Sequence, residues 1–102
     1  MPIMIYHEEV LDDVRSIPVN IRERIKSAIE GRIAVDPLKY GEPLRRSLAG
    51  HRKMRVGDYR VVYQIFGEEI RIWTIDHRKK VYSIMERRKR KPFRASQDKK
   101  KK

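Results

Sequence analysis

The sequence contains no cysteine, which excludes disulfide frameworks and thiolate chemistry. It also lacks an apolar run near the roughly 20 residues that a membrane-spanning helix needs. The first six residues have neither a basic region nor a long apolar stretch, so they predict a β-strand rather than a signal peptide. The 102 residues suit one domain with one modest core, and we expect a cytoplasmic protein without membrane contact.

Positive charge dominates the composition and is concentrated at one end. Residues 87–102 hold ten Lys and Arg against one acid, a net +9, which leaves +3 of the total +12 for residues 1–86. A basic surface attracts polyanions, so this pattern favours contact with nucleic acid or the ribosome. Small basic domains also occur without such partners, particularly where charged surfaces serve stability at high temperature.

Hydrophobic spacing predicts a strand and two helices in the first third of the chain. Residues 3–6 alternate with the period of two that is typical of a strand. Apolar residues recur every three or four positions in residues 7–17 and again in residues 21–33. These two stripes, with Pro18 between them, predict a helical hairpin that buries its apolar side on a sheet.

After Gly50 the hydrophobic period changes to alternation, and glycine-containing turns separate the segments. Strands are predicted at residues 51–56, 59–66, 70–75 and 81–85. The fold class is therefore α+β, with an N-terminal strand, a two-helix hairpin and an antiparallel three- to four-strand meander in one twisted sheet. We expect helices on one face of this sheet and an open second face.

The domain is expected to span residues 1–86. Residues 87–102 are too charged and too poor in apolar side chains to pack, so they predict a disordered basic tail with Phe93 as a candidate anchor. A solvated tail without a function and an electrostatic grip on RNA are both consistent with this composition.

Four cations and a tyrosine stand out in the second half of the chain. Lys53 and Arg55 share one strand face because alternate residues do, and Arg60 follows on the next strand. Arg78 and Tyr82 come after the third strand of the meander and are expected at the adjoining edge of the same concavity. Cations on one patch repel each other unless an anion neutralises them. The pattern therefore predicts a phosphate-binding site.

Cleavage of RNA by its own 2′-hydroxyl requires a base, cations that stabilise the pentacoordinate phosphate, and an acid for the leaving 5′-oxygen. Arg55 and Arg60 suit the second role because guanidinium forks match phosphate oxygens. Tyr82 suits the role of base only if neighbouring cations favour its phenolate. His77 is a competing candidate acid or base, since imidazole exchanges protons near neutral pH.

Other aromatic and histidine residues favour structural roles. Tyr59 and Tyr63 flank a Val-Val core strand, and Trp73 lies among isoleucines, so all three are expected to pack in the core. The three histidines are scattered and no cysteine accompanies them, so neither a metal nor another cofactor is expected.

Two segments resemble a known family in motif and in order. They are Lys53-x-Arg55-Val56-Gly57-Asp58-Tyr59-Arg60-Val61-Val62-Tyr63 and His77-Arg78-Lys79-Lys80-Val81-Tyr82. With the order strand, helical hairpin and meander, these segments resemble the RelE/ParE toxin superfamily, and RelE-type mRNA interferases in particular, over about residues 3–86. RelE toxins cleave mRNA in the ribosomal A site and are silenced by a cognate antitoxin. The resemblance therefore implies a metal-independent endoribonuclease whose partners are mRNA, the ribosome and a RelB-like antitoxin, with which it forms a hetero-oligomer.

Carried over by position, the resemblance also implies roles for single residues. Lys53 and Arg55 would bind phosphate or stabilise charge, and Arg60 would stabilise the transition state. Arg78 would assist the leaving group, and Tyr82 would be the base or would orient the nucleophile. Further RNA or phosphate contacts are expected from Arg52, Lys79, Lys80, Arg87 and Arg88.

A second activity fits the same resemblance. ParE-type members share the fold and inhibit DNA gyrase as binding proteins, and other members are non-catalytic. The presence of Arg60, Arg78 and Tyr82 favours the ribonuclease.

Overall fold

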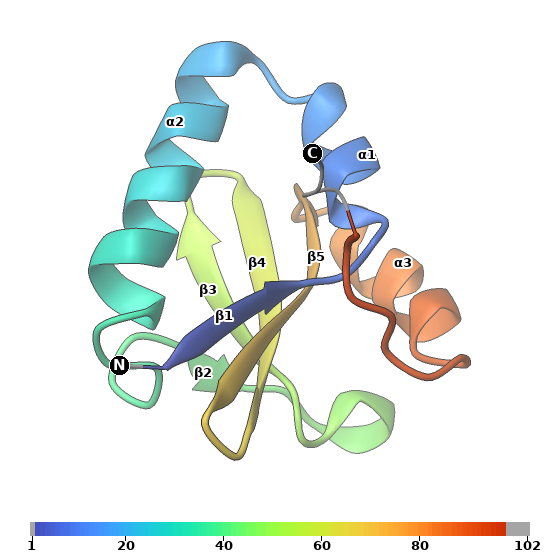
Figure 1. Ribbon diagram of the computed structural model, residues 1–102. Helices are drawn as coiled ribbons and strands as arrows, with labels where there is room; N and C mark the ends of the chain where they lie inside the picture. Colours follow the sequence, from blue (N-terminus) through green and yellow to red (C-terminus); the bar gives the residue numbers. More distant parts are fainter. Residues whose placement is uncertain (1, 98–102) are drawn as a thin grey trace.

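The structure, a computed structural model, describes residues 2–97 and contains one five-stranded mixed sheet between helices (Figure 1). The elements in chain order are β1 (Ile3–Tyr6), α1 (Val10–Arg15), α2 (Val19–Ala28), the π-helical turn η1 (Ile29–Ile33), β2 (Glu42–Pro43), the 3-10 turn η2 (Arg46–Leu48), β3 (Arg52–Val56), β4 (Tyr59–Phe66), β5 (Glu69–His77) and α3 (Val81–Arg88). The strand order is β1-β5-β4-β3-β2, with β1 parallel to β5 and the other neighbours antiparallel. The predicted α+β class is confirmed.

The first predicted strand and the first three strands of the meander are confirmed within two residues of their predicted ends. The helical hairpin is also present, although α1 is shorter than predicted and ends before Pro18, which is the N-cap of α2. The continuation of α2 over Ile29–Ile33 is wound as a π-helix. The two-residue strand β2 lies in a segment that the sequence predicts as loop.

The strand predicted at residues 81–85 is wrong, because this segment is the helix α3. Val81 and Met85 are both fully buried, and a spacing of four residues places them on one face of a helix. A run of five residues is too short for periodicity to separate a helix from a strand. Packing against the sheet decides between them here.

One face of the sheet packs against α1 and α2. Ile25 and Ile29 on the helical side meet Met54, Val61 and Ile75 on the strands, and all five are nearly inaccessible to solvent. Burial of such side chains stabilises a domain by roughly 1.5–3 kcal/mol each relative to their exposure. This first core is the one that the sequence predicts.

A second core covers part of the face that was expected to be open. It contains Leu48, Val62, Trp73, Val81 and Met85, contributed by η2, β4, β5 and α3. Figure 1 shows α2 and α3 on opposite sides of the sheet. The expectation of one fully open face is therefore wrong.

A β-bulge in β5 sets which side chains face the second core. Val62 pairs with Thr74, whereas Tyr63 pairs with Ile72, so Trp73 is an extra residue in the strand. Trp73 packs in the second core, and the Thr74 hydroxyl donates to Met85 Sδ of α3 at 3.3 Å. The bulge places both residues on the same face and reverses the alternation of β5 beyond this point.

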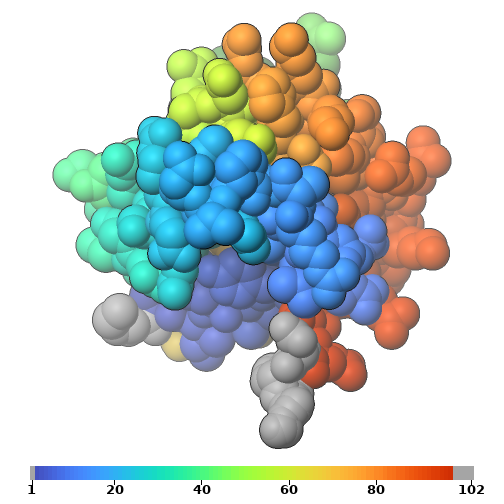
Figure 2. All heavy atoms as spheres, turned by 90° about the horizontal axis from the view of Figure 1, so that it is seen from above, coloured from blue at the N-terminus to red at the C-terminus, as the bar shows by residue number. Residues whose placement is uncertain are grey.

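The prediction of a disordered tail from Arg87 is wrong for residues 87–97. Helix α3 continues to Arg88, and Phe93 packs edge-on against Trp73 with ring centroids 5.0 Å apart. The backbone N–H of Ser96 donates to Tyr6 O at 2.7 Å, so the chain returns to β1. Figure 2 shows this red segment beside the blue N-terminal elements. The rest of the predicted tail, residues 98–102, lies outside the described residues, and within them no helix is long and apolar enough to cross a membrane.

Two buried histidines flank Trp73 and predict a loss of stability at mildly acidic pH. The rings of His7 and His51 lie 5.5 and 5.4 Å from the Trp73 ring, and burial lowers the pKa of both imidazoles. The unfolded chain therefore binds more protons than the folded chain once the pH falls below about 6.5. We expect full stability above that pH and a falling urea midpoint from pH 6.5 to 5.5, measured by the fluorescence of Trp73. The His7→Gln/His51→Gln double variant should show a flatter dependence, and an equally steep one would contradict this origin.

Candidate functional site

Three predicted cations share the face of the sheet that carries α3. Met54 and Val56 of β3 point into the first core, so alternation places Lys53 and Arg55 on the opposite face. Arg60 is the cross-strand partner of Arg55 in the β3–β4 pairing. Like charges directly opposite each other are unfavourable in a sheet, so a bound anion would stabilise this arrangement.

The side chain of Arg60 is held in place by the β3–β4 turn. Its Nη1 donates to Gly57 O at 3.0 Å and to Tyr59 O at 2.9 Å, and the residue is 8% exposed. On its other side Arg60 faces Asp76, its partner in β5. Gly57 has a φ of +59°, a conformation that glycine adopts without strain. The turn thus presents a preorganised guanidinium rather than a mobile one.

Arg78 is attached to the same turn from the end of β5. Its backbone N–H donates to Asp58 O at 2.8 Å, and its Nε lies 3.7 Å from Asp58 Oδ1. The side chain is 55% exposed, so its guanidinium remains accessible to a ligand. The turn at Gly57 and Asp58 therefore brings Arg60 and Arg78 to one end of the sheet, although 18 positions separate them in the sequence.

Tyr82 joins this face from α3, and not from a strand as predicted. It is the second residue of the helix and packs at the margin of the second core. Lys53 Nζ lies 5.7 Å from the centroid of the Tyr82 ring. An ammonium group at this distance from an aromatic face makes a cation–π contact. The helix supplies the aromatic group that the sequence predicts for the site.

His77 does not join the cluster. Because the bulge at Trp73 reverses the alternation, Asp76 faces Arg60, and His77 pairs with Tyr59 on the other face with ring centroids 5.5 Å apart. The Nδ1 atom of His77 accepts a hydrogen bond from the N–H of Lys79. These contacts place His77 away from the cations, and its role as an acid or base stays a prediction.

Two of the predicted phosphate-binding arginines have structural contacts. Arg52 lies on the face of the first core, and its Nη2 donates to Leu38 O at 3.0 Å and to Gly41 O at 2.8 Å. Arg88 is buried in a bidentate ion pair with Asp13. These contacts engage both guanidinium groups, and the roles in phosphate binding stay predictions. The remaining predicted phosphate contacts are exposed, and they are Lys79, Lys80 and Arg87.

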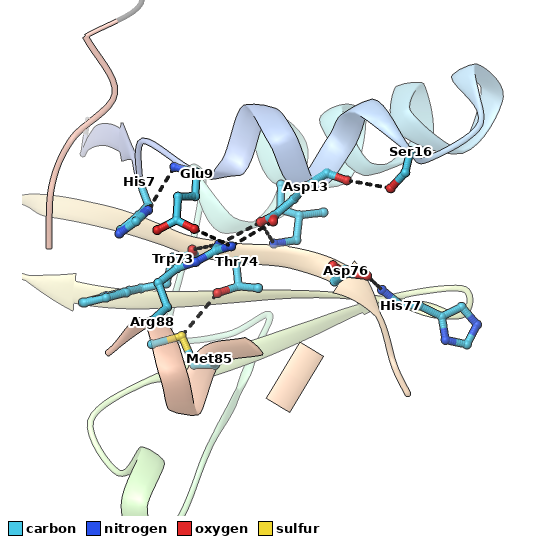
Figure 3. A network of polar contacts seen from close by, with 11 residues as sticks. His7, Glu9, Asp13, Ser16, Trp73, Thr74, Asp76, His77, Met85 and Arg88 are labelled. Carbon is cyan, nitrogen blue, oxygen red and sulfur yellow. Dashed lines mark hydrogen bonds and ion pairs between the residues drawn. The ribbon is translucent and has the colours of Figure 1, made fainter. Parts of the chain in front are cut away.

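The Asp13–Arg88 pair is the site feature that sequence reasoning missed (Figure 3). By position alone, Asp13 is one of several acids near the start of a predicted helix, and Arg88 belongs to the basic segment. An acid within an otherwise apolar helical stripe was the available signal, since a carboxylate that faces a core needs a partner there.

An apolar groove among the described residues does not contain the cation cluster. It has a volume of about 680 Å³, lies between α1, α2 and β1, and is lined mainly by apolar side chains such as Met4, Val14 and Ile29. In the part of the chain that the structure describes, no group of three or more His, Asp or Glu residues is placed to hold a metal ion.

The arrangement can bind a phosphodiester and stabilise added negative charge on it. Arg60 and Arg78 offer guanidinium groups at one turn, while Lys53 and Arg55 line the adjoining strand. Charge-assisted hydrogen bonds from guanidinium groups to phosphate oxygens are among the stronger ones in proteins. Tyr82 adds a hydroxyl group on the same face.

Comparisons with known proteins agree on one family. Residues 4–82 match the family described as ParE toxin of type II toxin-antitoxin system, parDE. The chain is 36% identical over 72 residues to toxin RelG of Mycobacterium tuberculosis strain ATCC 25618 / H37Rv. The aligned region covers 69% of this chain and 83% of that protein.

Solved structures give the same result. A chain of the toxin-antitoxin complex RelBE2 of Mycobacterium tuberculosis superposes with a TM-score of 0.69 and 31% identity, covering 76% of this chain and 99% of that one. A chain of the RelB-RelE antitoxin-toxin complex of Methanococcus jannaschii gives a TM-score of 0.62 and 26% identity, covering 78% and 96%. The family match spans most of the domain and includes every cation of the cluster. The chain therefore belongs to the ParE toxin family of type II toxin-antitoxin systems.

Proposed function

We propose that this toxin is a metal-independent endoribonuclease that cleaves mRNA in the ribosomal A site, in the cytoplasm where translating ribosomes are found. The observation that carries the proposal is the position of Lys53 Nζ, 5.7 Å from the Tyr82 ring, on the face that also presents Arg55 and Arg60. A purely structural sheet face gains nothing from this group of cations. The similarity to toxins RelG and RelE of Mycobacterium tuberculosis supports the same activity.

In the proposed reaction the 2′-oxygen of one nucleotide attacks the adjacent phosphorus atom and the bond to the 5′-oxygen breaks. The products are a 2′,3′-cyclic phosphate and a 5′-hydroxyl end. Tyr82, in its phenolate form beside Lys53, accepts the proton of the 2′-hydroxyl and becomes a neutral phenol. Arg55 and Arg60 stabilise the charge on the pentacoordinate phosphate, and Arg78 stabilises the leaving oxygen until it is protonated.

The proposed partners follow from the same family. Chains similar to this one occur in complexes with antitoxins. We infer a RelB-like antitoxin that forms a hetero-oligomer with this toxin and silences it. Lys79, Lys80 and Arg87 are exposed and extend the positive charge around Tyr82, which suits contact with mRNA and ribosomal RNA.

Inhibition of DNA gyrase is the second candidate function, because the matching family is described by its ParE toxin. A protein that only binds gyrase does not need a tyrosine in contact with a lysine. It also does not need arginines from two strands on the same face of the sheet. The two functions also differ in their product, since only the ribonuclease leaves cut mRNA.

The test is primer extension on mRNA in a translating extract, with the wild-type protein beside Tyr82→Phe. We expect cuts within the reading frame that depend on translation and are lost in the variant, because phenylalanine keeps the ring but cannot accept the proton. Absence of cuts with the wild type, together with growth arrest and disturbed DNA supercoiling, would assign the protein to the gyrase-inhibitor class. Naked RNA is not a suitable substrate for this test, since the proposed reaction takes place on the ribosome.

A further inference from the structure

Helix α3 carries Tyr82 at its start and Arg88 at its end. With eight residues it is too short to be stable by itself, so its position depends on what it packs against. Val81 and Met85 are fully buried against the sheet and hold the middle of the helix. Arg88 holds its last turn, together with the hydrogen bond that Ser47 Oγ donates to Glu86.

The contact of Arg88 joins three elements (Figure 3). Its Nη1 and Nη2 donate to Asp13 Oδ2 and Oδ1 of α1 at 2.9 and 3.0 Å, and Nη1 also donates to Trp73 O of β5 at 2.9 Å. Asp13 Oδ2 accepts a further hydrogen bond from the N–H of Ile75 at 3.1 Å. Both side chains are only 6% exposed. The pair therefore ties α3 to α1 and to the backbone of β5 at one point.

The Asp13–Arg88 pair lies beside the part of β5 that extends beyond its pairing with β1. The pairing of β1 with β5 runs to Tyr6 and Ile72, and the next backbone groups of β5 bond to the ion pair. Burial alone would lower the pKa of Arg88, but the hydrogen bonds and charge of Asp13 outweigh it and raise that pKa. Arg88 thus remains charged, and the hydrogen bonds of the pair are directed at fixed points of the sheet.

We propose that Asp13 and Arg88 are positioning residues for the reaction at Tyr82, an inference that rests on the proposed ribonuclease function. Arg88 follows Tyr82 by six positions, which corresponds to about 9 Å along the helix axis. With its last turn released, α3 can tilt about Val81 and Met85 and move the Tyr82 hydroxyl relative to Lys53. A displacement of about 1 Å at a reacting group is enough to slow catalysis roughly 100-fold. The family match ends at residue 82, so Arg88 lies beyond the part of the chain that it covers.

The test uses Asp13→Asn and Arg88→Lys in single-turnover cleavage on ribosomes programmed with mRNA. Asparagine at position 13 keeps an oxygen that accepts from the N–H of Ile75 but removes the negative charge. Lysine at position 88 keeps the positive charge but loses the paired donors of the guanidinium group. We expect the cleavage rate at saturating toxin to fall by roughly 10- to 100-fold in Asp13→Asn. Arg88→Lys should retain an intermediate rate, and the half-saturating concentration should stay within about twofold, because Arg55 and Arg60 still bind the phosphate.

A destabilised variant with α3 intact separates positioning from a general loss of stability. Ile29→Ala removes a buried side chain of the first core, on the opposite side of the sheet from α3. At a temperature where circular dichroism shows all variants folded, Ile29→Ala should cleave at the wild-type rate. An equal loss of rate in Ile29→Ala and Asp13→Asn would overturn the proposal.

Hydrogen exchange gives a readout that does not depend on cleavage. The amides of Ile84 and Lys89 donate to Lys80 O and Met85 O at the two ends of α3. They should exchange faster in Asp13→Asn relative to β4 amides, and unchanged exchange in α3 would overturn the positioning role. If the wild type does not cleave mRNA, the proposed function fails and the role at Tyr82 fails with it. If the wild type cleaves and both variants match its rate, the positioning proposal alone is overturned.

Discussion

Replacing Arg78 with alanine is expected to lower the rate of mRNA cleavage by roughly 100- to 1,000-fold, the effect typical of losing one donor to a developing negative charge. The side chain of Arg78 is 55% exposed, and its Nε lies 3.7 Å from Asp58 Oδ1, which is also exposed. Truncation of Arg78 therefore leaves no buried group unpaired. The backbone hydrogen bond from Arg78 N–H to Asp58 O is available to alanine as well. The fold should therefore be unchanged while the reaction is lost. Primer extension in a translating extract and growth arrest on expression measure the effect.

Arg15→Ala is the matched control for Arg78→Ala. Arg15 is also an exposed arginine in an ion pair, with Asp12 on α1, and its removal changes the net charge equally. It lies at the last turn of α1, and none of the site residues contacts it in the described interactions. Arg78→Lys should recover part of the rate, since it restores the charge without the fork. Wild-type cleavage by Arg78→Ala would remove this residue from the proposed centre.

Replacing Asp13 with alanine is expected to lower the free energy of unfolding by about 3–5 kcal/mol, the cost of leaving one partner of a buried ion pair without the other. Alanine would leave the guanidinium of Arg88 buried without a counter-charge and the N–H of Ile75 without its acceptor. The loss is not one of helix propensity, because alanine is the better helix former. Urea unfolding followed by Trp73 fluorescence measures it, since Trp73 O accepts from Arg88.

Asp12→Ala tests whether burial causes this effect. Asp12 precedes Asp13 on α1 and pairs with Arg15, but the side chains of that pair are 72% and 68% exposed. Exposed pairs contribute little because water already solvates both charges. Asp12→Ala should unfold at nearly the wild-type urea concentration. Equal losses from the two substitutions would mean that the charge of α1, and not the buried contact, matters.

Much of the candidate site could be predicted because strand alternation is a local property. Lys53 and Arg55 share a face for that reason, and their pairing with β4 follows from the short turn at Gly57. Alternation does not give the position of His77. A bulge inserts one residue at Trp73 and reverses the alternation after it, so that Asp76 faces Arg60 in place of His77. Nothing in the periodicity of residues 70–77 shows where such an insertion occurs.

The sequence by itself determined the α+β class, the strands of the meander, the apolar stripes of the helical hairpin and the gathering of cations on one sheet face. Each of these depends on spacing between residues close in the chain. Only the tertiary structure decided that Tyr82 lies on a helix and that Arg88 is buried, because both depend on partners far away in the sequence. Asp13 and Arg88 are 75 positions apart, so the chain must fold before the guanidinium of Arg88 can contact the carboxylate of Asp13. Long-range packing, and not local preference, thus places the residue that we propose to hold the reacting tyrosine.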